Sequence, residues 1–240
     1  MRLWSPTLVP PSPASEPSRQ RLFGVYPGVV TDLLDPDDQG RVKVRLPWVG
    51  EDDSIQATAW ARLATLMAGA DRGSWFIPEV DDEVLLSFLA GDPRHPVVLG
   101  ALWNGVDAPP ESMDGGGENN IRSITSRSGH KLEFDDTSGG EKITLVTQGG
   151  HELVLDDASG GTITVNHSGG AQIVIESSGT ISVAALNQIN IDAPAGLNVT
   201  AAMVTVDSAF SKFSGVVKAD TVITNAVVSS SYTPGAGNVW

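Results

Sequence analysis

Short apolar-x-apolar pairs recur through the second half of the chain. The segment 129–140 (GHKLEFDDTSGG) returns at 150–161 (GHELVLDDASGG), and a looser third copy runs through 170–179. Each copy holds two such pairs, separated by Asp-Asp or Ser-Gly sequences typical of turns, so each copy predicts two strands. The apolar positions of these strands are Leu132, Phe134, Ile143, Leu145, Leu153, Leu155, Ile163, Val165, Ile173, Ile175, Ile181 and Val183.

Beyond Ile181 the motif repeats with a period of eight. The next pairs are Ile189 with Ile191 and Leu197 with Val199, and a further pair follows displaced by one residue. Two apolar side chains per rung form a stripe too thin for one chain to bury, which favours identical ribbons wrapped around each other, most simply three. About a dozen rungs at ~4.8 Å each would give a shaft of roughly 55–60 Å. We therefore predict a trimeric, intertwined triple-stranded β-helix (β-prism) over residues 129–228. Its predicted interior holds the positions given above together with Ile189, Ile191, Leu197 and Val199.

Residues 22–106 have a different texture, with five short runs of strand-forming residues. These runs cover 24–34, 40–46, 58–66, 83–90 and 97–103. Residues 41–46 (RVKVRL) alternate strictly between cations and apolar residues, as a half-buried antiparallel strand does. A single helical turn is expected at 64–70. Five short strands with one small helix predict an all-β barrel, of which the OB-fold is the commonest small example. Its predicted core contains Val42, Val44, Leu46, Trp60, Phe76 and Val84.

Three other segments flank these two parts. Residues 1–21 hold five prolines and predict an extended arm, which either grips a neighbouring subunit or stays free. Residues 107–128, rich in Pro and Gly, are too short to fold alone and read as a linker, and 229–240 form a C-terminal tip segment. No apolar run suits a signal peptide or a membrane span, so export by a cleaved N-terminal signal is not expected.

The charge balance excludes several function classes. The chain has 15 Lys and Arg against 29 Asp and Glu, a net charge of −14, and no Cys. A nucleic-acid binder needs a basic face, and so does docking on an anionic membrane. Without Cys there is no disulfide framework, zinc ribbon or thiol nucleophile. We expect no nucleic-acid partner and no cofactor.

Two sets of repeated polar residues invite a chemical interpretation. His130 and His151 occupy equivalent repeat positions, but a metal site needs three or four converging ligands, so we interpret them as solvent-facing residues beside turns. Asp135-Asp136 and Asp156-Asp157 supply paired carboxylates, yet adjacent residues point to opposite sides of a strand or lie in a turn. Their Ser-Gly-Gly context favours turns. We therefore expect no metal site, no catalytic residue and no enzyme.

Several motifs nevertheless resemble a known family. Residues 40–48 (GRVKVRLPW), 60–62 (WAR), 73–85 and 88–104 are similar in order and spacing to phage baseplate protein V and the VgrG spikes of type VI secretion, and 125–136 resemble the neck of those spikes. The resemblance implies a homotrimeric central spike with an OB-fold collar above a triple-stranded β-helix. Such a spike belongs to the baseplate of a phage-like particle assembled in the bacterial cytoplasm, and is driven through a target cell envelope when the sheath contracts.

The same resemblance implies separate partner proteins at both ends. Only the short arm precedes the barrel, so the hub is expected to be a separate protein on the N-terminal side. No histidine follows His167, so we expect a PAAR-type tip protein rather than a histidine-metal tip. The residues expected to bind that tip protein are Tyr232, Pro234, Val239 and Trp240. The alternatives are a tail-spike-like polysaccharide hydrolase with a β-helical body and an OB-type nucleic-acid binder. Phage and injection system both remain open.

Overall fold

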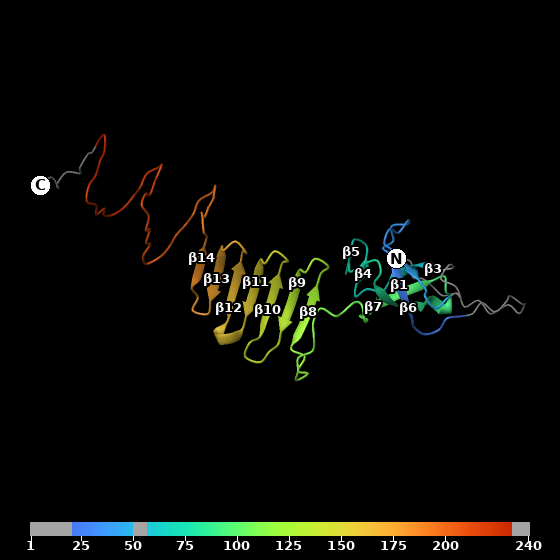
Figure 1. Ribbon diagram of the computed structural model, residues 1–240. Coiled ribbons are helices and arrows are strands. Elements are labelled where there is room, and N and C mark those ends of the chain that lie inside the picture. The colour runs from blue at the N-terminus through green and yellow to red at the C-terminus, as the bar shows by residue number, and fades with distance from the viewer. Residues whose placement is uncertain (1–20, 50–56, 232–240) are drawn as a thin grey trace, which may run out of the picture. The chain divides into compact units, whose positions relative to one another are not determined.

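The computed structural model describes residues 21–49 and 57–231, and all of its regular elements apart from two short 3₁₀ turns are β-strands (Figure 1). The chain divides into two units, Met1–Asn187 and Gln188–Trp240, which we describe separately. Most of the predicted arm and the proposed tip residues Tyr232, Pro234, Val239 and Trp240 lie outside the described residues.

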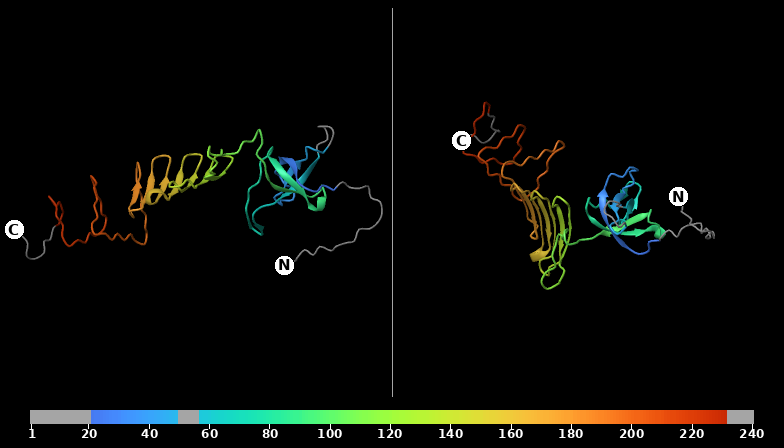
Figure 2. Two further views of the ribbon diagram at one scale, coloured as in Figure 1. Left: turned by 90° about the horizontal axis from the view of Figure 1, so that it is seen from below. Right: turned by 45° about the vertical axis from the view of Figure 1, so that its right-hand side comes forward.

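The first unit begins with a closed five-stranded barrel of the OB type. Its strands pair in the order β1-β2-β3-β7-β6, and every pairing is antiparallel except β3 with β7 (Figure 2). That parallel pairing closes the barrel by placing Arg62 opposite Val97. The strands are β1 (Tyr26–Asp32), β2 (Val42–Arg45), β3 (Thr58–Leu63), β6 (Glu83–Phe88) and β7 (Pro96–Ala101).

The barrel encloses the hydrophobic core of the described chain. Alternate residues of its strands point inward, as the period of two requires. The interior is tight at Gly28, where a Cβ atom would lie 2.5 Å from Leu86 Cδ1, so only glycine lets β1 approach β6 this closely. The buried apolar residues are Val30, Val42, Val44, Leu46, Ala61, Val84, Leu86, Phe88 and Val98.

Two of the six predicted core residues lie elsewhere. Trp60 is half-buried, with the Arg41 guanidinium 5.9 Å from its ring centroid. Phe76 is 72% exposed, so its assignment to the core was wrong. It follows a short hairpin of β4 (Ala68–Gly69) and β5 (Arg72–Gly73) that stands in place of the helical turn predicted at 64–70. The left-handed Asp71 (φ 53°) makes the tight turn of this hairpin, which a right-handed helix does not allow.

A seven-stranded antiparallel sheet follows the barrel within the same unit. Each strand pairs with its neighbour in sequence, so the sheet is a simple meander from β8 to β14 (Figure 1). β8 falls inside the segment predicted as linker, so the sheet begins earlier than expected. The strands are β8 (Ile121–Thr125), β9 (Lys131–Asp135), β10 (Lys142–Val146), β11 (Glu152–Asp156), β12 (Thr162–Asn166), β13 (Gln172–Glu176) and β14 (Ile181–Ala184).

The repeat seen in the sequence produces equivalent turns at one end of the strands of this sheet. In the turns 126–130, 147–151 and 167–171, the N–H of the first residue donates to the C=O of the fifth at 2.8–2.9 Å. The fourth residue of each turn is a glycine in the left-handed region, with φ of 84°, 80° and 94°. Because other residues enter that region at a cost, the repeated glycines favour these tight turns.

The second unit contains no helix or strand within its described residues 188–231. Its orange-to-red trace in Figure 1 carries no strand arrows. The predicted interior residues Ile189, Ile191, Leu197 and Val199 are 54–70% exposed here. In the parts of the chain that the structure describes, no helix is long and apolar enough to cross a membrane.

Candidate functional site

Among the described residues of the first unit, the β8–β14 sheet carries a continuous apolar face. The strand register aligns the apolar pairs of successive strands, so that Leu155 on β11 lies opposite Ile143 on β10 and Ile163 on β12. The pairs therefore merge into two rows across the sheet. One row is Phe134, Ile143, Leu155, Ile163, Ile175 and Ile181, and the other is Ile124, Leu132, Leu145, Leu153, Val165, Ile173 and Val183.

These rows contain every shaft-interior position predicted between residues 132 and 183. They also contain Ile124, which sequence reasoning missed because its strand was assigned to the linker. The available signal was the turn 126–130, whose Gly129-His130 repeats the Gly150-His151 of the next turn.

This apolar face is uncovered in the described chain. Leu132 and Leu153 are half-buried, whereas the exposed fraction of the remaining residues of the two rows ranges from 38% at Ile143 to 65% at Ile181. All of the fully buried apolar residues in the described part belong to the barrel. Single chains rarely expose contiguous apolar patches of more than a few hundred Å², so a face of this kind marks an interaction surface.

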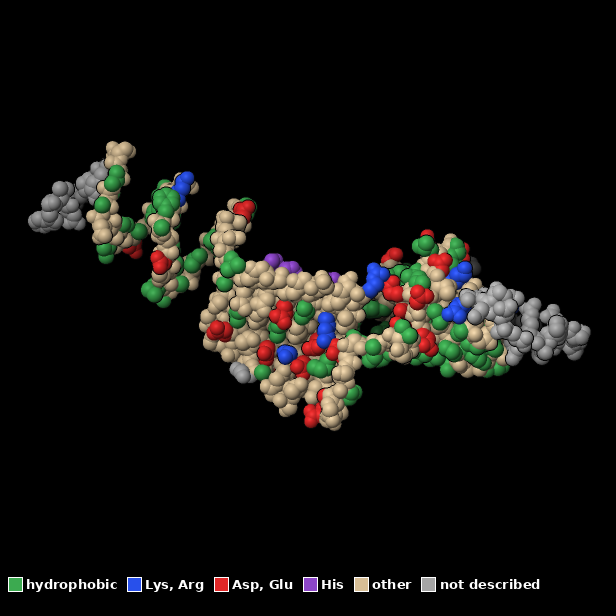
Figure 3. Space-filling model, viewed as in Figure 1, with side chains coloured by type: hydrophobic (Ala, Val, Ile, Leu, Met, Phe, Trp, Pro, Cys, Tyr) green, Lys and Arg blue, Asp and Glu red, His purple; other side chains and the backbone are tan. Residues whose placement is uncertain are grey.

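The opposite face of the same sheet is mostly polar, with Val146, Val154 and Val174 set among threonines and charged residues. Figure 3 shows charged side chains gathered over the sheet on the side it presents. Lys131 Nζ lies 2.5 Å from Glu133 Oε2 and 2.6 Å from Glu111 Oε1, and Lys142 Nζ lies 3.5 Å from Asp135 Oδ2. The sheet is therefore amphipathic, with one face suited to solvent and one suited to burial.

The paired carboxylates of the repeats serve the turns. Asp135 Oδ1 accepts the N–H of Thr137 at 3.0 Å, and Asp156 Oδ1 accepts that of Ala158 at 2.7 Å, while Asp136 pairs with Arg122. Hydrogen bonds from Thr137 hold the pKa of Asp135 below its usual value. A general acid in a glycosidase needs a raised pKa, so the shift at Asp135 does not suit that role.

His130, His151 and His167 lie in the turns at one end of the strands of this sheet. His130 Nδ1 accepts the N–H of Gln148 at 3.2 Å and His151 Nδ1 accepts that of Ser168 at 3.2 Å, so each ring ties its own turn to the next. The His151 and His167 rings lie 4.3 Å apart between centroids. Among the residues placed by the structure, no three His, Asp or Glu side chains are grouped so as to hold a metal ion.

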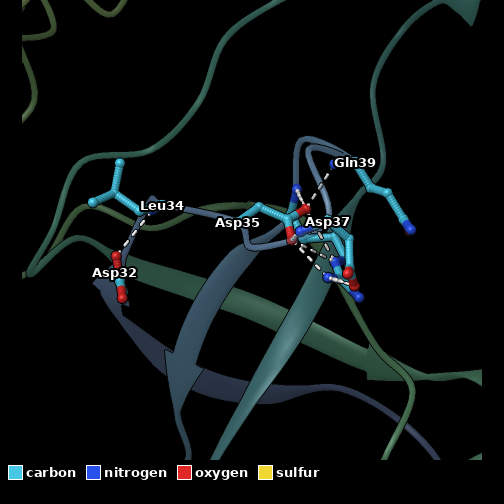
Figure 4. A network of polar contacts seen from close by, with 6 residues as sticks. Asp32, Leu34, Asp35, Asp37 and Gln39 are labelled. Carbon is cyan, nitrogen blue, oxygen red and sulfur yellow. Dashed lines mark hydrogen bonds and ion pairs between the residues drawn. The ribbon is translucent and has the colours of Figure 1, made fainter.

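The β1–β2 loop of the barrel is organised around one carboxylate (Figure 4). Asp35 accepts backbone N–H groups from Asp37, Gln39 and Arg41 at 2.9–3.1 Å, and the Arg41 guanidinium lies 2.6 Å from Asp35 Oδ1. The Arg41 hydrogen bonds hold the pKa of Asp35 far below its ordinary value. Arg41 is one of the three cations on the outer face of 41–46, and the carboxylates already bound to it weaken that face as a phosphate site.

Together, a closed OB-type barrel and a repetitive amphipathic sheet define an all-β protein whose exposed apolar face is built for assembly. Residues 26–103, which span the barrel, match the type VI secretion system/phage-baseplate injector OB domain family. The similarity to this family is confined to the barrel, and over a longer stretch the chain is similar to VgrG spike proteins.

Three of these relatives illustrate the extent of the similarity. The chain is 34% identical over 116 residues to type VI secretion system spike protein VgrG3 of Vibrio cholerae serotype O1, covering 47% of this chain and 11% of the relative. It is 32% identical over 158 residues to spike protein VgrG5 of Pseudomonas aeruginosa, covering 60% and 19%. The match to the actin cross-linking toxin VgrG1 of Vibrio cholerae is 30% over 119 residues, covering 47% and 11%. The chain thus spans between about a tenth and a fifth of the length of these curated relatives.

Proposed function

We propose that this chain forms a homotrimeric central spike of a contractile tail or injection system, located in its baseplate. The observation that carries the proposal is the two-row apolar face of the β8–β14 sheet, exposed on a chain whose barrel matches an injector family. Three copies that turn these faces toward a common axis would bury both rows in a prism and leave the polar faces in water. The predicted triple-stranded β-helix is this arrangement continued toward the C-terminus.

The apolar face offers enough burial to hold such a prism together. Full burial of a Val, Leu, Ile or Phe side chain stabilises by ~1.5–3 kcal/mol. The rows' side chains are already about half covered by their neighbours, so each would contribute roughly 1 kcal/mol on association, or on the order of 10 kcal/mol per chain. Part of this gain offsets the lost translational and rotational freedom of the chains.

The proposed function is mechanical rather than enzymatic. A spike driven through a target cell envelope needs slow separation of its chains, and shared apolar faces provide this resistance. On the N-terminal side we propose a separate hub protein. At the C-terminal end we propose a PAAR-type tip protein that binds Tyr232, Pro234, Val239 and Trp240.

Light scattering of the purified chain tests the trimer directly. The chain mass is 25.1 kDa, so three copies give 3 × 25.1 = 75.3 kDa. Val165→Asp puts a charge into the apolar face of β12 and is expected to yield monomers, because a buried unpaired carboxylate costs several kcal/mol. Thr164→Asp, on the polar face of the same strand between Val154 and Val174, is the matched control and is expected to stay trimeric. A monomeric wild-type chain at micromolar concentration would overturn the proposal.

A further inference from the structure

The second unit has apolar strand-like sequence but lacks the hydrogen bonds of a folded strand. Within the described residues 188–231, one hydrogen bond joins two backbone groups, from Gly196 N–H to Ala193 C=O at 3.0 Å. Every described residue of this unit is exposed. Extended backbone whose N–H and C=O groups lack partners is a poor fold on its own, because those groups are nearly always paired when a structure is compact.

The composition of this unit is nevertheless that of a folded β-segment. The pairs Ile189 with Ile191 and Leu197 with Val199 continue the spacing begun by Ile181 and Val183 on β14. Disordered segments combine low hydrophobicity with high net charge. Residues 188–231 contain two Lys and three Asp, a net charge of 2 − 3 = −1 out of −14 for the whole chain. The sequence is suited to burial, so the missing element is a partner backbone.

The β8–β14 sheet differs from this unit in one decisive respect. Each of its internal strands is paired on both sides within the same chain, so the sheet needs other copies only to cover its apolar face. Residues 188–231 need other copies for their backbone hydrogen bonds as well. The two parts of the shaft therefore depend on assembly to different degrees.

In the trimer proposed above, residues 188–231 pair with the same residues of other copies; we propose that this pairing forms only after the β8–β14 sheets have associated. This inference rests on the proposed trimer. Association of the sheets would hold the attached segments at an effective concentration of order mM, which turns their pairing into a nearly intramolecular step. Without it, the pairing of three separate extended segments is a slow, non-local event.

Other copies of this chain are the backbone partner of residues 188–231 that the observations favour. The segment's near-zero charge allows three copies to approach closely, whereas the remainder of the chain carries −14 − (−1) = −13. Its two-residue apolar period matches that of the β14 strand which precedes it, so symmetry-related copies would enter the segment in the same register. Because the sheets fix that register first, the C-terminal unit would pair last and then oppose dissociation of the assembled chains.

Hydrogen exchange on the full chain, read by mass spectrometry alongside light scattering, tests this order. In the wild-type trimer both β9–β13 and 188–231 are expected to be protected. Ile191→Asp should remain trimeric and keep protection in β9–β13, but lose roughly 100-fold of the protection in 188–231. Asn190→Asp, which changes the neighbouring polar position, is the matched control and should keep both. Val165→Asp should produce a monomer whose residues 188–231 exchange freely.

Pulsed labelling during refolding of the wild-type chain gives a second measurement that does not depend on any variant folding. The amides of β9–β13 are expected to gain protection first, and those of 188–231 later, at a rate set by assembly. Protection of 188–231 in a monomer, its protection before the sheet, or a monomeric Ile191→Asp chain would each overturn the inference. A wild-type chain that never assembles would instead refute the proposed trimer, so the two failures are distinguishable.

Discussion

Truncation of one central side chain of the apolar face should weaken the trimer by a predictable amount. Leu155 lies on β11, the middle strand of the seven, between Ile143 and Ile163, and 39% of its surface remains exposed in the single chain. If association buries that remainder, Leu155 contributes about 0.39 of the ~1.5–3 kcal/mol for full burial, or roughly 0.6–1.2 kcal/mol per chain. Leu155→Ala removes most of this contribution from three chains, so the trimer loses roughly 2–3.5 kcal/mol. At ~1.36 kcal/mol per factor of ten, the overall association constant falls about 30- to 400-fold.

Sedimentation equilibrium in mild urea, which brings dissociation into a measurable range, is the assay for this change. Val154→Ala is the control because Val154 lies on the same strand but on the polar face, in register with Thr144 and Thr164. It is expected to lower the stability of each sheet while leaving the association constant within about twofold. If Leu155→Ala leaves association unchanged and Val154→Ala weakens it, the interface lies on the other face and the reasoning fails.

Four further outcomes are expected. Leu86→Ala in the barrel core should lower the unfolding free energy by ~2–5 kcal/mol in thermal melts, whereas Phe76→Ser, at a 72% exposed position, should change it by less than ~0.5 kcal/mol; equal effects would contradict the core as described. Asp35→Asn should lower the barrel's melting temperature near pH 6, and its difference from the wild type should shrink steadily as the pH falls below ~3.9, because a carboxylate whose folded pKa is depressed stabilises fully above the unfolded value and loses that contribution as the pH falls toward and through the folded value. His151→Ala should speed hydrogen exchange at the Ser168 amide, which loses its acceptor, while the Gln148 amide bound by His130 stays unchanged; equal acceleration at both would argue against the individual contacts. Removal of residues 232–240 should abolish binding of a PAAR-type tip protein in a pull-down while the trimer mass, less the removed residues, is retained; retained tip binding would refute the tip assignment.

The sequence predicted most of the barrel and sheet because both are encoded by local alternation. Val42, Val44 and Leu46 are buried together since a two-residue period on one strand fixes a single face. Phe76 was misplaced because hydrophobicity alone does not say whether a residue lies in a strand. Phe76 follows the β4–β5 hairpin in the chain, and the turn of that hairpin depends on the left-handed Asp71 rather than on an apolar pattern. Ile124 was missed for a related reason. β8 contributes only this one residue to the two apolar rows, where it lies opposite Leu132, and a turn that contains Ser126 and Ser128 follows it.

The C-terminal unit marks the limit of reasoning from one chain. Its eight-residue period predicts rungs, but a rung requires backbone partners, and within residues 188–231 a single chain supplies almost none. The same consideration explains where the acidity lies. An uncovered apolar face and the outer edges of β8 and β14 would invite indefinite sideways pairing, and repulsion among chains that carry −13 outside the C-terminal unit opposes it. Three copies carry 3 × −14 = −42, so a further chain can add only where apolar burial exceeds that repulsion. In the proposed trimer, three faces closed on one another would leave no apolar face exposed, and growth would stop there for reasons of both geometry and charge.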